Sequence, residues 1–204
     1  MISILNYGMG NIRSVQNALN FLKIESKVIK TPDEILRSEK LILPGVGSFK
    51  KAMENIKNKR LLDPLNEIAI DKNVPILGIC LGMQLMAEKS EEAGITEGLG
   101  WVKGASKKFS SHDLNIKVPH VGFNTVVFEK NNKSLYNGLD NQADFYYVHS
   151  YRISYNDCDA ASGWTNYGDK FVASIEKNNI FGTQYHPEKS QSNGLILLKN
   201  FSQI

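Results

Sequence analysis

The residues with the clearest chemical potential lie in segment 74–85, which reads Val-Pro-Ile-Leu-Gly-Ile-Cys-Leu-Gly-Met-Gln-Leu. Gly78, Cys80 and Gly82 have the spacing of a nucleophile elbow, in which a reactive side chain sits on a sharp strand-to-helix turn between small residues. The helix predicted to follow, over about 81–89, points its N-terminus at Cys80 and favours a thiolate and a developing oxyanion. A buried, inert cysteine in an apolar strand is the alternative, because free cysteines are often buried.

A nucleophilic cysteine needs a general base, and of the four histidines His186 has the setting that suits this role. A strand predicted over 180–185 ends directly before it, which places the imidazole at the carboxyl edge of a parallel sheet, the same edge as an elbow cysteine. Pro187 fixes the backbone there, and Glu188 is placed to hold the imidazole in one tautomer. Taken alone, His186 would be better explained as a strand-end histidine without a role. Together the residues predict nucleophilic catalysis by Cys80, His186 and Glu188.

The other histidines and the second cysteine carry weaker signals. His112 follows two serines in a polar segment, and nothing in the sequence around it indicates a functional role. His149 lies on an apolar strand and fits either a pocket residue or a satisfied core histidine. Cys158 lies between two aspartates, whose charges raise the pKa of a thiol, so we expect it to be unreactive.

Length and composition limit the classes of protein to which this chain can belong. The 204 residues, 42% hydrophobic and 22% charged, suit one α/β domain that spans 1–204. The net charge of +3 gives no reason to expect nucleic acid or a membrane as partner. No apolar run approaches the roughly 20 residues that cross a bilayer, and no His or Cys pair has metal-ligand spacing, so we expect no metal. A reactive thiol without a disulfide framework or signal peptide predicts a cytoplasmic protein.

The order of elements indicates how the site is positioned. Strands are predicted over 2–5, 27–30, 41–43 and 76–79, with helices over 11–22, 50–59 and 61–71. This alternation implies a parallel sheet with helices on both faces. Further strands are predicted over 101–109, 125–128, 145–151, 160–164, 171–176 and 180–185, with a last helix over 194–201. The fold class is therefore α/β, with a central, mostly parallel sheet and an antiparallel C-terminal portion.

Three segments resemble the signature blocks of class I glutamine amidotransferases. They are Gly-Ile-Cys-Leu-Gly-Met-Gln at 78–84, Gln-Tyr-His-Pro-Glu-Lys-Ser at 184–190 and Leu-Pro-Gly-Val-Gly-Ser-Phe at 43–49. Segments 6–11, 119–124 and 145–151 resemble one branch of that family, the glutaminase subunits of imidazole glycerol phosphate synthase. The resemblance spans essentially the whole chain. It departs at Phe123, where the branch has tryptophan, and this leaves open a sister branch that supplies ammonia to enzymes of surface-polysaccharide sugar biosynthesis.

The resemblance implies a flavodoxin-like fold and a reaction. L-Glutamine would be hydrolysed to glutamate and ammonia without a cofactor. The ammonia would pass to a (βα)₈-barrel cyclase that makes imidazole glycerol phosphate and AICAR in histidine biosynthesis, the two subunits forming a heterodimer. Because free ammonia is lost to solvent, the partner should dock over the Cys80 pocket, with candidate contacts at 7–11, 46–49, Pro119, His120 and Lys189.

The resemblance also implies which residues hold the substrate. Backbone N–H groups of Leu81 and of the Val46-Gly47 loop would bind the oxyanion. The glutamine itself would lie against Gln84, His149, Ser150 and Tyr151. Two other functions compete: a cysteine hydrolase or peptidase of similar fold, and a scaffold subunit without activity. The Gln84 and 146–151 matches argue against the first, and the intact triad residues argue against the second.

Overall fold

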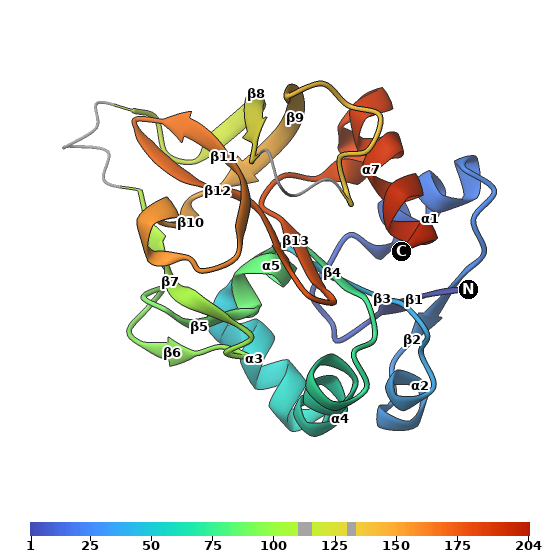
Figure 1. Cartoon of the computed structure of the whole chain (residues 1–204). Coiled ribbons are helices and arrows are strands. Elements are labelled where there is room, and N and C mark those ends of the chain that lie inside the picture. The colour runs from blue at the N-terminus through green and yellow to red at the C-terminus, as the bar shows by residue number, and fades with distance from the viewer. Residues whose placement is uncertain (110–115, 130–133) are drawn as a thin grey trace.

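The computed structural model describes residues 1–109, 116–129 and 134–204, so His112 lies outside the described residues. Strands and helices alternate in the first half of the chain around the parallel part of a large sheet (Figure 1). These strands are β1 Ile2–Leu5, β2 Ser26–Ile29, β3 Leu41–Gly45, β4 Ile76–Cys80 and, from near the other end of the chain, β13 Ile180–Thr183. They lie in the order β2-β1-β3-β4-β13, and each neighbouring pair is parallel.

The rest of the sheet is antiparallel. It is made of β8 His120–Phe128, β9 Gln142–His149, β11 Ala161–Tyr167 and β12 Asp169–Lys177, in the order β13-β12-β11-β8-β9. A smaller sheet in the order β10-β7-β5-β6 consists of β5 Ala87–Ser90, β6 Thr96–Glu97, β7 Val102–Lys108 and β10 Tyr151–Ile153. The predicted α/β class with an antiparallel C-terminal portion is confirmed.

Helices cover both faces of the parallel strands (Figure 1). One face carries α2 Pro32–Leu36, α3 Phe49–Asn58, α4 Leu62–Asn66 with a π turn over Glu67–Asp71, and α5 Leu81–Leu85. The other carries α1 Ile12–Phe21 and α7 Gln191–Gln203. Neighbouring side chains of a strand point to opposite faces, so Leu41 and Leu43 join the first core while Ile42 joins the second.

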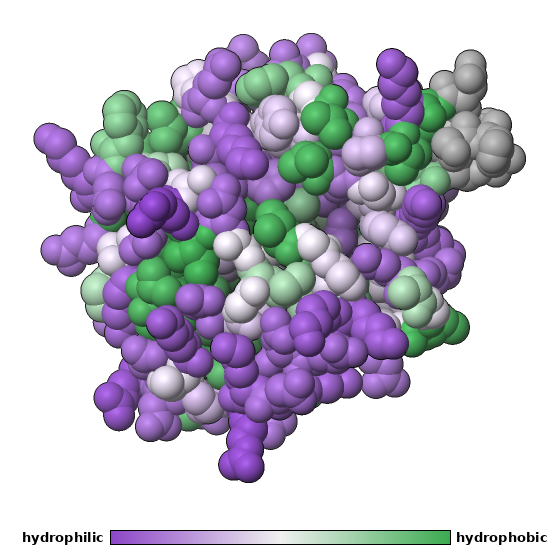
Figure 2. Space-filling model, turned by 180° about the vertical axis from the view of Figure 1, so that it is seen from behind, coloured by the Kyte–Doolittle hydropathy of each residue, from purple (hydrophilic) through white to green (hydrophobic). Residues whose placement is uncertain are grey.

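The surface agrees with this burial of apolar residues. From behind, the molecule is mainly hydrophilic, with apolar residues exposed in small separate groups (Figure 2). Within the described residues, none of the helices has the length and apolar character that crossing a membrane requires.

The helix predicted over 81–89 is too long. It ends at Leu85, and the chain then becomes strand β5, which pairs in parallel with β7. Leu85, Met86 and Ala87 are all fully buried. Extended pairing buries this apolar run between two sheets, and that tertiary gain overrides the helix propensity of the residues that follow.

Helix α2 and strands β8 and β9 also differ from the prediction. Helix α2 was not predicted, although its capping box was present in the sequence: Thr31 accepts from the Glu34 backbone N–H, and Glu34 accepts from that of Thr31. Strands β8 and β9 begin at His120 and Gln142, earlier than predicted, because they form a long two-stranded ladder with each other.

The turn after β4 requires close backbone approach. A Cβ atom at Gly82 would lie 1.8 Å from the carbonyl oxygen of Leu43, and one at Gly78 would lie 2.7 Å from the backbone of Met83. Both contacts are shorter than real Cβ atoms make, so both positions need glycine. The requirement for small residues on either side of Cys80 is thereby explained by the packing of α5 on β3 and β4.

We expect Gly82→Ala to destabilise the fold by roughly 3 kcal/mol, because the new methyl group overlaps a backbone atom that cannot move aside. Gly138→Ala is the matched control, since its φ is +85° but no atom lies within 4 Å of the added Cβ. It should lose only about 1 kcal/mol, the cost of a left-handed alanine. Urea unfolding measures both; equal losses would contradict the packing argument.

Candidate active site

Cys80 lies on a strained turn between a strand and a helix. It is the last residue of β4 and directly precedes α5, with φ 54° and ψ −108°. A non-glycine residue in this region costs about 1–3 kcal/mol, and such strain persists where the surrounding structure enforces it, commonly at functional sites. The nucleophile-elbow geometry predicted for this residue is therefore present. The thiol is buried, and its sulfur lies 4.0 Å from the carbonyl oxygen of Val148 on β9.

His186 and Glu188 form a buried pair beside this turn. β13 is parallel to β4, with Thr183 opposite Ile79, so the chain beyond β13 emerges at the same edge as Cys80. His186 Nδ1 lies 2.8 Å from Glu188 Oε1, and each side chain is 1% exposed. This contact places the ring hydrogen on Nδ1. Nε2 accepts no hydrogen bond from the described residues and is free to exchange a proton with another group.

The protonation of His186 is set by its neighbours. Burial lowers the pKa of His186, but Cys80 and Glu188 together outweigh burial and raise it to about 10. A thiolate and a carboxylate both favour the imidazolium form. Cys80 exerts this effect without a well-formed hydrogen bond to Nε2, as is common for catalytic contacts before a substrate binds. The arrangement suits transfer of a proton between sulfur and imidazole.

The segment after β3 lies against the start of α5. Gly45 is opposite Cys80 in the β3–β4 register, and a Cβ at Gly45 would lie 2.8 Å from the Gly82 backbone nitrogen. Val46 and Gly47 follow at the surface, with Gly47 at φ +100°. The structure thus brings Gly45, at the start of the 45–47 loop, against Leu81 and Gly82. The oxyanion site itself stays a prediction.

Comparison with known proteins identifies the family. The family model described as "Glutamine amidotransferase class-I" matches residues 3–203. The chain belongs to this family. It is 46% identical over 204 residues to imidazole glycerol phosphate synthase subunit HisH 1 of Campylobacter jejuni strain RM1221, with both chains fully covered. The subunit HisH 1 of Methanococcus maripaludis is 45% identical over 207 residues, and the subunit HisH of Leptospira interrogans is 40% identical over 206, again with full coverage of each chain.

Solved structures agree on the fold. A structure titled "Crystal structure of glutamine amidotransferase" superposes with a TM-score of 0.73 at 15% identity and covers 100% of this chain and 99% of its own. The structure of PurLQS from Thermotoga maritima gives a TM-score of 0.72 at 19% identity, with 98% and 96% covered. At these identities the likeness concerns the fold alone.

Gln84 of this amidotransferase chain, predicted to contact the substrate, is buried on α5 beneath Cys80. Its Nε2 donates to the Tyr151 carbonyl oxygen (2.9 Å) and to Gln184 Oε1 (3.0 Å). Gln184 in turn directs its own Nε2 at the Cys80 sulfur, 3.7 Å away. Both hydrogens of the Gln84 amide nitrogen are therefore used inside the protein. Sequence reasoning did not assign Gln184 a role, although it lies in the same block as His186.

The other predicted pocket residues lie near Cys80 but are occupied by internal bonds. The Ser150 carbonyl oxygen accepts from the Phe109 N–H. His149 is buried and uses both ring nitrogens, one on the Tyr151 carbonyl and one on His120. The His149 ring is therefore satisfied within the protein, and the place of His149 in a substrate pocket stays a prediction.

Two expectations about the pocket mouth need correction. His120 was expected at a partner surface, but it is buried between aromatic rings. Tyr7, two residues after β1, and Phe49, the first residue of α3, are also buried in the core. Val46 and Lys189 are exposed as expected.

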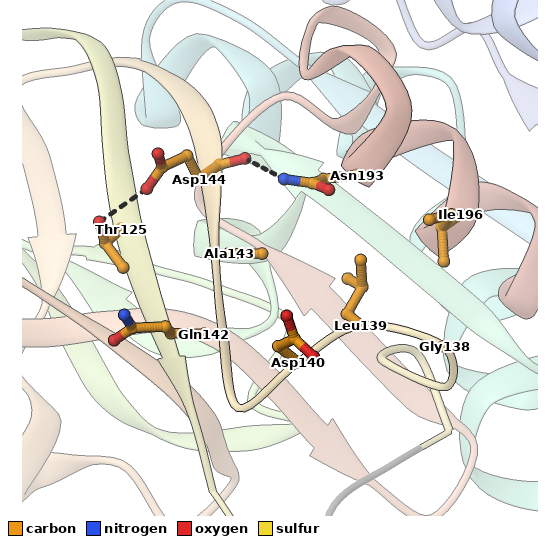
Figure 3. A pocket seen from close by; sticks show the side chains of 9 residues that line it. All are labelled: Thr125, Gly138, Leu139, Asp140, Gln142, Ala143, Asp144, Asn193 and Ile196. Atoms are coloured by element: carbon orange, nitrogen blue, oxygen red, sulfur yellow. Dashed lines mark hydrogen bonds between the residues drawn. The ribbon is translucent and has the colours of Figure 1, made fainter.

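A polar pocket of about 540 Å³ elsewhere on the molecule has no part in this site. It lies between the β8–β9 ladder and α7 (Figure 3), where Asp144 accepts from Thr125 Oγ1 and Asn193 donates to the Asp144 carbonyl. None of the triad residues lines it.

We expect Cys80→Ala to lower the pKa of His186, because the substitution removes one of the two groups that raise it and leaves burial in place. NMR titration of the His186 ring measures this directly. Cys158→Ala is the control, since Cys158 lies in another part of the fold and should leave the His186 titration unchanged. An unchanged pKa in Cys80→Ala would show that the thiol and imidazole do not interact.

Proposed function

We propose that this protein is the glutaminase subunit of an imidazole glycerol phosphate synthase, formed by one amidotransferase domain over 1–204. It hydrolyses L-glutamine to glutamate and ammonia. The observation that carries the proposal is the strained Cys80 turn beside the buried His186–Glu188 pair, in a chain 40–46% identical over its full length to proteins with that subunit name.

The chemistry follows from the positions of three side chains. His186 Nε2 takes the proton of Cys80, and the thiolate attacks the side-chain amide carbon of glutamine. His186 then gives that proton to the leaving ammonia, and a thioester remains on Cys80. Water, deprotonated by His186, hydrolyses the thioester to glutamate and returns the thiol. Glu188 holds the His186 imidazole in the Nδ1–H tautomer and stabilises the imidazolium. The raised pKa of His186 favours this charged form at neutral pH.

The tetrahedral intermediates carry a negative oxygen that needs positioned donors. The backbone N–H of Leu81, at the start of α5, is the first, and the Val46-Gly47 loop supplies the second. The close contact between Gly45 and the backbone of Gly82 supports this assignment, because it holds the loop against the helix start. Gly47, with its positive φ, can orient a peptide N–H that other residues could not.

Substrate binding is proposed for Gln84, His149, Ser150 and Tyr151. Gln84 donates both Nε2 hydrogens to groups within the protein, so it contacts glutamine through the oxygen of its side-chain amide. The stretch 149–151 contributes through its backbone, since the His149 ring is fully bonded internally. Gln84 and His149 are buried and Ser150 and Tyr151 are half-buried, which supports a pocket that is partly shielded from water.

An apolar strip beside the nucleophile supports a partner subunit. We call Val121, Phe123, Tyr146 and Val148 the docking strip: Val121 is opposite Val148, and Phe123 is opposite Tyr146, in the β8–β9 register. Directly opposite residues share a face of a sheet. Three of them are strongly exposed, at 56% for Val121, 50% for Phe123 and 37% for Val148. Contiguous exposed apolar residues mark interaction surfaces.

The position of the docking strip fits the transfer of ammonia. The Val148 carbonyl lies against the Cys80 sulfur, so a protein bound to the strip covers the mouth of the site. Ammonia in water at neutral pH becomes ammonium and loses its nucleophilicity, which makes a covering acceptor necessary. We propose that the partner is a (βα)₈-barrel cyclase that forms a heterodimer with this chain in the cytoplasm. Lys189, exposed and 5.8 Å from the Tyr146 ring centroid, borders the same surface.

The sister function, ammonia supply to a surface-sugar enzyme, is not favoured. It rested on Phe123 in place of tryptophan, yet Phe123 retains an aromatic ring, packed edge-on to Tyr146 at 5.6 Å. The relatives described above carry the synthase subunit name in three genera.

We expect the purified chain to release glutamate from glutamine, and the host's cyclase with its nucleotide substrate to stimulate this release strongly. Cys80→Ala should lose about 10⁶-fold in kcat, because no other group provides the nucleophile, and Glu188→Gln should lose roughly 10³-fold. Cys158→Ala should retain full activity. If the cyclase neither binds nor stimulates, the partner is a different enzyme.

We expect Phe123→Ala to weaken cyclase binding about tenfold, since a half-exposed aromatic at the centre of an interface is a typical hot spot. Ile70→Ala is the matched control, because Ile70 is 62% exposed on the π turn after α4, at the opposite end of the molecule from β8 and β9 (Figure 1). Titration calorimetry distinguishes the two variants. Equal Kd values for Phe123→Ala and the unsubstituted chain would remove the docking strip from the interface.

A further inference from the structure

A row of buried and partly buried hydrogen bonds leads from β8 towards the nucleophile. Asn124 Nδ2 lies 3.2 Å from His120 Nε2, and His120 Nδ1 lies 3.0 Å from His149 Nε2. His149 Nδ1 lies 2.8 Å from the carbonyl oxygen of Tyr151. Each ring nitrogen of the two histidines thus has one partner. No step of the reaction described above uses the His120 side chain or the His149 ring.

The direction of these bonds is fixed by the backbone at one end. The Thr125 N–H donates to Asn124 Oδ1, and the Asn166 carbonyl oxygen accepts from Asn124 Nδ2. Asn124 therefore presents N–H to His120, whose Nε2 must accept. The remaining hydrogen of His120 is on Nδ1 and is donated to His149 Nε2, so His149 in turn carries its hydrogen on Nδ1. One tautomer of each ring satisfies all the contacts.

The row continues to the sulfur through two glutamines. The Tyr151 carbonyl oxygen accepts from Gln84 as well as from His149. Because Gln84 donates to Gln184 Oε1, the amide of Gln184 can have one orientation only, with Nε2 towards Cys80. An N–H aimed at sulfur stabilises a thiolate more than a thiol, since hydrogen bonds to charged groups are the stronger ones.

Aromatic packing keeps His120 in place and dry. Its ring is stacked between Tyr147, at 4.7 Å between centroids, and Tyr167, at 3.9 Å. Phe109 and Phe171 pack edge-on against it. Burial lowers the pKa of His120 to about 4, so the ring is neutral at physiological pH.

His149 is neutral for the same reason. Burial lowers the pKa of His149 to about 3, the Tyr151 carbonyl opposes this shift, and the neighbouring His120, His186 and Arg152 side chains add to it. A second proton on either ring would set N–H against N–H and break the row. Two neutral rings of fixed tautomer are therefore the state that this environment selects.

We propose that His120 and His149 are positioning residues for the Cys80 thiolate. They hold the Tyr151 carbonyl oxygen where it accepts a hydrogen bond from Gln84. Gln84 in turn orients Gln184 so that the Nε2–H of Gln184 points at the Cys80 sulfur. The proposal rests on the proposed function in taking Cys80 as the nucleophile. The thiolate itself is tested by alkylation, which requires neither glutamine nor a partner.

The first test uses the unsubstituted protein. Long-range ¹H–¹⁵N NMR spectra of the imidazole rings should show both His120 and His149 as neutral Nδ1–H tautomers that do not titrate between pH 5 and 9. A ring in the Nε2–H tautomer, or one that titrates near pH 6.5, would overturn the proposal without any variant.

The second test measures the rate at which iodoacetamide alkylates Cys80 at pH 7. Gln184→Met keeps the size of the side chain and removes its N–H, and the rate should fall about tenfold. His149→Leu and His149→Asn have equal size, but asparagine keeps a donor near the position of Nδ1. The leucine variant should be several-fold slower than the unsubstituted protein, and the asparagine variant should recover most of the rate.

Ser38→Ala is the control for general destabilisation. Ser38 is buried and bonded to Ser3 and to the Glu34 carbonyl, with no link to the site. It should lower Tm without changing the alkylation rate. Equal rates for His149→Leu and His149→Asn in the folded state would show that His149 acts through packing alone, and the proposal would fail. Normal alkylation without glutaminase activity would instead refute the proposed function.

Discussion

The site depends on the close contact between the turn after β4 and its neighbouring strands. Cys80 is held in a left-handed conformation because α5 starts immediately beneath β3, at distances that exclude a side chain at Gly82. Gly45 meets the same turn from β3, so one steric constraint fixes both the nucleophile and the loop that would bind an oxyanion. The strain in the turn is maintained by the surrounding packed sheet and cannot relax without separating these elements.

The parallel half of the sheet brings the catalytic groups together. β13 comes from the end of the chain but lies beside β4, so His186 emerges next to Cys80 although 106 positions separate their numbers in the sequence. The antiparallel half serves a different purpose. Its strands β8 and β9 contribute a carbonyl to the Cys80 pocket and carry an exposed apolar strip beside it. A single pair of strands thus connects the site with its proposed partner surface.

Most polar groups buried around Cys80 have hydrogen-bond partners inside the protein. Two histidines, two glutamines and the Tyr151 carbonyl are linked by donors and acceptors that each have one consistent orientation. An unpaired polar group in such a place is costly, so a fully paired network specifies one arrangement of the pocket. The exceptions near Cys80 are the Tyr7 hydroxyl, His186 Nε2 and Glu188 Oε2, which have no partner among the described residues. The imidazole nitrogen is the atom that the reaction requires to be free.

The sequence alone determined the family and predicted the triad, because the residue types and spacing that define them lie within short segments such as 78–84 and 184–190. It also determined most strands and helices, through periodicity that local sequence carries. Only the tertiary structure decided that α5 ends at Leu85 and that Gln84 bonds to Gln184, 100 positions away. Sheet register sets such pairings, and register depends on the packing of the whole chain. The strand pattern allowed His149 either a pocket or a core position, and only the fold shows that its ring is bonded to His120 and to the Tyr151 carbonyl.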